Sequence, residues 1–209
     1  NVLLEFNPVI PQDYYNSDIL LLGNIDPALQ MRVIEQLPTR PKLVVMDTMN
    51  FWMTPGFIDT LHQVMKKVDV LAINDAEARE LSGEYSLVKA ARKIMKMGPT
   101  YLIIKKGEHG ALLFHENEVF FAPALPLEDV FDPTGAGDTF AGGFCGFLDK
   151  SRDISFENMK RAIIYGSAMA SFCVEKFGAE RLRNLTQHDI EDRVKDFIDL
   201  VQFDIVLED

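Results

Sequence analysis

The stretch KLVVMDTMNFWMTPGFIDTLHQVMKKVDVLAIN, residues 42–74, predicts a strand, a helix and a second strand. Its two ends, residues 42–47 and 69–74, are short and apolar throughout, and residues 55–68 read as an amphipathic helix. Strands without polar alternation are typical of parallel sheets that helices cover on both faces, and the intervening helix supplies the crossover. The stretch therefore predicts an α/β layered fold with a mostly parallel sheet.

The same unit recurs on both sides of this stretch. Asp26 is a suitable N-cap with Pro27 at the first helical position, and Gly83 and Ser86 are expected to end one helix and cap the next. The predicted elements are strands at 18–25 and 100–107, helices at 26–37, 75–83 and 86–97, and an antiparallel hairpin at 111–122. The final third reads as helical. We expect residues 1–209 to form a single domain, and further chain to precede Asn1.

The composition excludes several classes of protein. A net charge of −11 and a pI near 4.8 disfavour sequence-independent binding to nucleic acid or anionic membranes. No run reaches the roughly 18 apolar residues of a membrane span. Cys145 and Cys173 lie in apolar helical patterns, which favours buried, reduced thiols in a cytoplasmic protein. The acidic segment 186–209 is expected to be a helix with a solvated face, with an interaction tail as the alternative.

The segment DPTGAGD, residues 132–138, precedes a helix-length apolar run. Gly135, Ala136 and Gly137 should therefore form the first helical turn, where backbone N–H groups lack intrahelical partners and favour an anion such as a phosphate. A carboxylate beside such a site, Asp138, suits a general base that removes a proton from an attacking hydroxyl. The alternative is a glycine turn without chemistry, in which Asp138 only favours the helix dipole.

The longer string DPTGAGDTFAGGF, residues 132–144, resembles the signature of the ribokinase-like (PfkB-type) carbohydrate and nucleoside kinases. The resemblance implies a three-layer α/β/α ribokinase-like fold that binds ATP and Mg²⁺ and phosphorylates a small sugar or nucleoside. It makes Asp138 the catalytic base and the amides of Gly135, Ala136 and Gly137 the anion hole. The resemblance covers most of the chain but lacks the first strands and the lid of a complete member.

Three further segments resemble the nucleotide side of that family. NDAE places Asn74 and Glu77 in an Asn-x-x-Glu element, where Glu77 would organise Mg²⁺ through water; the alternative is a surface helix start. In KKGEHG, Lys105 takes the place where many members have Thr. Lys105 or Lys106 would then supply a positive charge to a phosphate. The alternative is that both lysines are solvated and contact no ligand. Two glycines of this turn and two residues of GSAMASFCVEKFGA complete the implied nucleotide contacts: Gly107, Gly110, Ser167 and Gly178.

The substrate side carries less information. DTMNFW resembles the family's Asp-x-Asn element and implies Asp47 and Asn50 near the route to substrate, with Trp52 either stacking on a ligand or lying in the core. Asp132 corresponds to a position near a monovalent-cation site, or only caps its own turn. No Ser follows Gly178 as in potassium-activated members, so monovalent-cation activation is not expected. The four His residues share no ligand spacing, and no zinc site is proposed.

The resemblance leaves two functions open. The first is an ATP-dependent kinase acting on a sugar or nucleoside. The second is a nucleotide-binding module without catalysis, as a regulatory relative or a truncated fragment. A homodimer is an open alternative for the assembly, because lids form dimer contacts in relatives.

Overall fold

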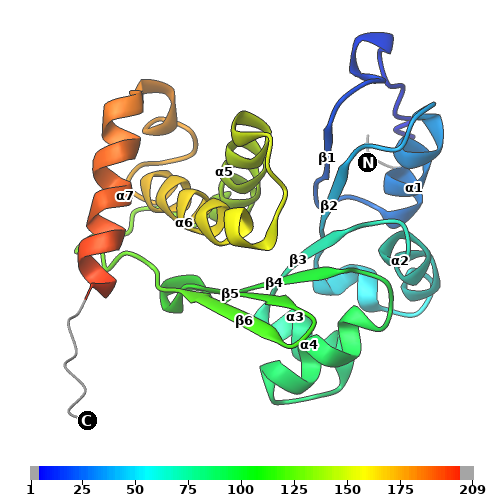
Figure 1. Ribbon diagram of the computed structural model, residues 1–209. Helices are drawn as coiled ribbons and strands as arrows, with labels where there is room; N and C mark the ends of the chain where they lie inside the picture. Colours follow the sequence, from blue (N-terminus) through cyan, green and yellow to red (C-terminus); the bar gives the residue numbers. More distant parts are fainter. Residues whose placement is uncertain (1–4, 203–209) are drawn as a thin grey trace. The chain divides into compact units, whose positions relative to one another are not determined.

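The computed structural model describes residues 5–202, which divide into two compact units (Figure 1). Of these residues, the first unit comprises 5–106 and 112–120, and the second comprises 107–111 and 121–202. Residues 1–4 and 203–209, including the end of the acidic segment, lie outside the described residues.

Strands and helices alternate through the first unit. Its elements are η2 (Gln12–Tyr14), β1 (Ile19–Leu22), α1 (Pro27–Gln36), β2 (Leu43–Asp47), η3 (Asn50–Met53), α2 (Ile58–Met65), β3 (Val70–Asn74), α3 (Asp75–Ser82), α4 (Leu87–Met95) and β4 (Tyr101–Lys105). The short helix η4 (Gly107–His109) leads to β5 (Ala111–His115) and β6 (Glu118–Ala122). The sheet has the order β1-β2-β3-β4-β5-β6, with β1 to β4 parallel. The predicted parallel sheet and late antiparallel hairpin are confirmed.

Local signals explain where several helices begin and end. The Asp26 side chain accepts a hydrogen bond from the Ala28 amide at 2.8 Å, with Pro27 in the first turn, as predicted for α1. Gly83 ends α3 with φ 68°. Helix α2 begins at Ile58 rather than at Pro55, because residues 55–57 form a turn in which Gly56 has φ 101°.

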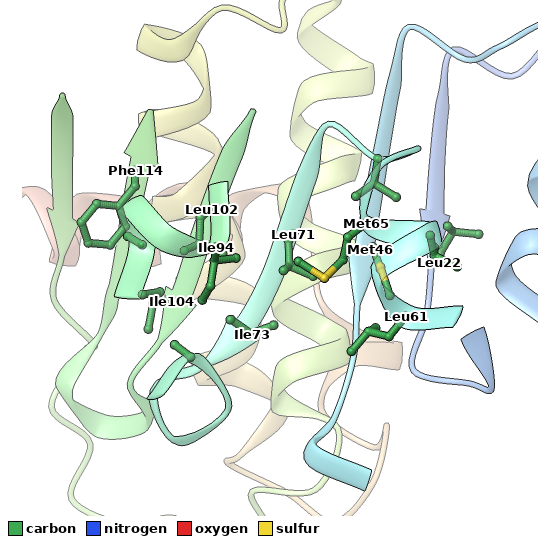
Figure 2. Close-up of a cluster of buried hydrophobic side chains, with 14 of the residues drawn as sticks. Leu22, Met46, Leu61, Met65, Leu71, Ile73, Ile94, Leu102, Ile104 and Phe114 are labelled. Atoms are coloured by element: carbon green, nitrogen blue, oxygen red, sulfur yellow. The ribbon is translucent and has the colours of Figure 1, made fainter. Parts of the chain in front are cut away.

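The core of the first unit lies on one face of β1 to β4. Figure 2 shows side chains of these strands, such as Met46 and Leu71, meeting Leu61 and Met65 of α2 and Ile94 of α4. In β2, β3 and β4 the alternate residues, such as Val45, Ala72 and Ile103, are also buried, whereas Leu21 of the edge strand β1 is exposed. Burial on both faces explains why the strands are apolar throughout, and it leaves the strand ends as the places for polar side chains.

The second unit is mainly helical. It contains α5 (Ala136–Ser151), α6 (Phe156–Cys173), η5 (Leu182–Asn184) and α7 (Gln187–Val201). Both thiols, Cys145 on α5 and Cys173 on α6, are free and buried as predicted, and burial raises the pKa of Cys145 to about 12. No helix within residues 5–202 is long and apolar enough to span a bilayer.

Helices α5 and α6 approach closely at two glycines. A Cβ at Gly143 would lie 3.1 Å from the Gly166 Cα, and a Cβ at Gly166 would lie 2.8 Å from the Phe140 carbonyl oxygen. Backbone atoms cannot give way as a flexible side chain can. These glycines are therefore required by the helix crossing.

We predict that Gly166→Ala lowers the free energy of unfolding by about 1–3 kcal/mol, because the added methyl group overpacks the crossing. Gly146→Ala is the matched control on α5, since a Cβ there meets no atom within 4 Å. This control should stabilise the protein by about 0.5–1 kcal/mol through helix propensity. Denaturant unfolding of both variants measures the difference, and equal stabilities would contradict the tight crossing.

Candidate active site

The first turn of α5 is shaped by Gly135, which occupies the N-cap with φ 81° and ψ 0°, a left-handed conformation that suits glycine. The Ala136 amide donates to the Pro133 carbonyl at 3.2 Å, and the Thr139 amide donates to the Gly135 carbonyl at 2.8 Å. Within residues 5–202, no hydrogen-bond partner is found for the amides of Gly135, Gly137 and Asp138. The helix tip therefore offers three donors to an anion.

These donors differ in one respect from the set that the sequence suggested. The Ala136 amide already has an acceptor, whereas the amide of Asp138 itself has none among the described residues. The Asp138 amide was not predicted as a donor, because the sequence pattern assigned a role only to the carboxylate of that residue. The general rule that the first four helical amides lack intrahelical partners would have included it.

The Asp138 carboxylate lies exposed in the first turn of α5. No hydrogen bond or ion pair within the described part of the chain engages it. It is therefore not used in a core contact, and it remains available to accept a proton from a ligand.

The loop before α5 is tied to the end of α6. The Phe131 amide donates to the Val174 carbonyl at 2.9 Å, and the Cys173 thiol lies 3.8 Å from the Thr134 carbonyl oxygen. Asp132 accepts from the Thr134 amide at 2.9 Å. That bond, with a smaller contribution from the Gly178 amide, lowers the pKa of Asp132. Asp132 thus caps its own turn, as the alternative interpretation had it, and its amide donates to the Val174 carbonyl at 3.4 Å.

The remaining predicted residues of the second unit have different environments. Ser167 is half-buried on α6, and Gly178 lies in an exposed turn after α6 with φ 56°. Gly107 and Gly110 also have positive φ, 56° and 84°. A Cβ at Gly110 would lie 2.0 Å from the Ala122 carbonyl oxygen, so packing against β6 already requires glycine there.

In the first unit, Asn74 and Glu77 form a reciprocal capping box at the start of α3. The Glu77 amide donates to the Asn74 side-chain oxygen at 2.8 Å, and the Asn74 amide and side-chain nitrogen donate to the Glu77 carboxylate at 2.9 Å and 2.7 Å. Glu77 is 7% exposed, and burial raises its pKa. A surface helix start, the alternative interpretation, does not describe this buried carboxylate.

Lys105 and Asp47 form an ion pair at the same edge of the sheet. The Lys105 ammonium lies 2.9 Å and 3.1 Å from the two Asp47 carboxylate oxygens. In the strand register Lys105 lies opposite Asn74, and Asp47 lies opposite Ala72, so the lysine side chain reaches across β3. The first unit therefore brings together Asp47, Asn74, Glu77 and Lys105. Lys106, the next residue in the sequence, is half-buried.

The segment after β2 forms η3, in which Asn50 is exposed. Trp52 packs edge-to-face against Phe51 and Phe57, and it contacts the hydrophobic core. Its indole nitrogen donates to the Asn24 side-chain oxygen at 2.8 Å. These contacts agree with the alternative in which Trp52 packs in the core rather than stacking on a ligand.

Comparisons with known proteins agree with this architecture. The model of the pfkB family carbohydrate kinases matches residues 13–185. A cytidine kinase of Thermococcus kodakarensis is 31% identical over 150 residues, which are 69% of this chain and 52% of the relative. A ribokinase of Staphylococcus aureus is 31% identical over 57% of this chain and 39% of its own length. The chain thus spans about half the length, or less, of these curated relatives.

Solved structures confirm the ribokinase-like three-layer α/β/α fold class. The ribokinase of Thermotoga maritima superposes with a TM-score of 0.70 at 28% identity, over 88% of this chain and 58% of that one. The ribokinase of Arabidopsis thaliana, solved with ribose and ATP, gives a TM-score of 0.70 at 23% identity over 90% and 61%. The family model matches residues 13–185, well over half of the sequence, and the chain therefore belongs to the pfkB family of carbohydrate kinases.

Proposed function

We propose that this chain carries the nucleotide site and the catalytic base of an ATP-dependent kinase that phosphorylates a hydroxyl of a sugar or nucleoside. The observation that carries the proposal is the tip of α5, where three amides without partners in the described chain adjoin the uncommitted carboxylate of Asp138. Family membership supports the reaction class, and the named relatives act as ribokinase and cytidine kinase. Asn50, Asp47 and Asp132 are the candidate substrate contacts.

The proposed reaction is an in-line phosphoryl transfer. Asp138 takes the proton of the acceptor hydroxyl, the hydroxyl oxygen forms a bond to the γ-phosphorus, and the bond from that phosphorus to the bridging oxygen breaks to release ADP. The amides of Gly135, Gly137 and Asp138 stabilise charge on the transferred phosphoryl oxygens. Asp138 then returns its proton to solvent.

The other predicted residues would supply the nucleotide and magnesium contacts. Within residues 5–202 no group of three or more His, Cys, Asp or Glu side chains is placed to hold a metal. Mg²⁺ keeps several waters and binds through few carboxylates plus substrate phosphates, so Glu77 acting through water fits this ion. Bound Mg²⁺ would neutralise phosphate charge. Lys105 and Lys106 with Gly107 and Gly110 would contact phosphates, and Ser167 and Gly178 would lie near the adenine.

We predict that Asp138→Asn in the full-length natural protein lowers kcat by about 10²–10⁴-fold, because the amide cannot accept the hydroxyl proton. Mg-ATP binding should remain, since the backbone donors are unchanged. Phosphoryl transfer to a panel of sugars and nucleosides is the assay, and Asp149→Asn, exposed on the same helix, is the matched control. Equal rates in the two variants would end the base assignment. No transfer by the wild type, with nucleotide bound, would favour the non-catalytic module.

We predict that Glu77→Gln raises the Mg²⁺ concentration for half-maximal activity by about tenfold or more, as loss of an outer-sphere carboxylate does in other metal sites. Glutamine can still accept a hydrogen bond from the Asn74 amide, but its side-chain nitrogen cannot accept the second one from the Asn74 side chain, so the change removes the charge and one hydrogen bond. Glu80→Gln, on the exposed face of α3, is the control. An unchanged magnesium dependence would leave Glu77 a structural cap only.

A further inference from the structure

The Asp47–Lys105 ion pair joins two residues that the resemblance assigns to different ligands. Lys105 stands in the nucleotide turn, and Asp47 begins the segment near the substrate route. The pair is enclosed, with side-chain exposures of 19% for Lys105 and 7% for Asp47. The Lys105 side chain is thus the more exposed partner of the pair.

Such a pair is poised for exchange of partners. Burial makes an unpaired charge costly, so each charge requires a counter-ion. The Lys105 ammonium can donate three hydrogen bonds, and two of them go to the Asp47 carboxylate oxygens. A phosphate oxygen is a second anion that competes for the same ammonium, with short, charge-assisted hydrogen bonds.

We propose that Asp47 is the counter-ion that Lys105 exchanges for a nucleotide phosphate, so that nucleotide binding frees the Asp47 carboxylate for an acceptor hydroxyl. This inference rests on the proposed function and deepens it. A freed, buried carboxylate needs a new donor, and a sugar or nucleoside hydroxyl supplies one. Nucleotide and acceptor then each strengthen the binding of the other, as linkage requires.

The surroundings of Asp47 suit such a rearrangement. One of its oxygens also accepts from the Thr48 amide at 2.9 Å, and its carbonyl accepts from the Gln30 side chain at 3.1 Å. The Thr48 hydroxyl and the Gln30 side-chain oxygen are buried and without partners among the described residues. The end of β2 therefore holds spare acceptors for ligand hydroxyl groups or for water.

The segment after Asp47 contains a tryptophan whose fluorescence can report the proposed exchange. Residues 48–53 lead from Asp47 into η3, which contains Trp52, the single tryptophan of the chain. A change in the hydrogen bonds at Asp47 and Thr48 alters the start of this segment. Trp52 fluorescence thus detects release of Asp47 without knowledge of the acceptor.

The test uses the full-length natural protein, titrated with a non-hydrolysable Mg-ATP analogue and, separately, with adenine, which has neither a phosphate nor a sugar hydroxyl. In the wild type the analogue should change Trp52 emission and adenine should not; a Trp52→Phe variant identifies the signal. Asp47→Asn should bind the analogue about fivefold more tightly, because the competing carboxylate is gone, and Lys105→Met about fivefold more weakly. Neither variant should show the emission change, and adenine affinity should be unaffected in both.

A matched control and a second variant keep the test decisive. Asp18→Asn removes a carboxylate from an exposed pair with Lys42 at the other end of the strands, and should change nothing. If a single variant fails to fold, the double variant Asp47→Asn/Lys105→Met removes both charges and should bind as Lys105→Met does, without the emission change. A wild type that fails to bind the analogue would defeat the proposed function itself. If the wild type binds the analogue, two results would overturn the proposed exchange while leaving the proposed function in place. One is that Asp47→Asn binds the analogue no more tightly than the wild type. The other is an emission change in the double variant.

Discussion

Burial of the parallel strands on both faces is the constraint on which the site depends. Every residue of β2 is buried, and so is every residue of β3 except the last, Asn74, which is half-buried. Backbone groups in such strands are satisfied by the ladder, so the strand interior has no place for a polar side chain that lacks a partner. Polar chemistry is thus confined to the strand ends, where Asp47, Asn74 and Lys105 lie.

Features that depend on neighbours in sequence were predictable. The Asp26 cap, the Asn74 and Glu77 positions and the glycine tip of α5 each involve residues within a few positions of one another, and their residue types carry the signal. The Lys105–Asp47 pair joins residues 58 positions apart, and no periodicity or motif links them. Only the register of three strands brings the two together. The start of α2 was misplaced because Gly56 adopts a positive φ that the amphipathic pattern does not reveal.

Glycine illustrates why sequence alone cannot assign a role. Gly135 is required by a left-handed conformation at the helix tip, whereas Gly166 is required by the approach of the Phe140 backbone. The two glycines look alike in the sequence, and Gly146, which has open space around it, looks the same. Backbone angle and neighbouring atoms distinguish a glycine that exposes donors from one that permits packing.

The net charge of −11 raises the question of how this chain would attract a polyphosphate. Physiological salt limits the reach of exposed charges to about 8 Å, so most surface carboxylates contribute little at the site. Groups in contact with the ligand decide the balance. Backbone amides at the tip of α5 donate without carrying an ionic charge, and their orientation is fixed by the helix before any ligand arrives. A paired lysine adds positive charge only where its counter-ion is displaced. An acidic protein can therefore bind an anion selectively, because its attraction acts at contact distance rather than across its surface.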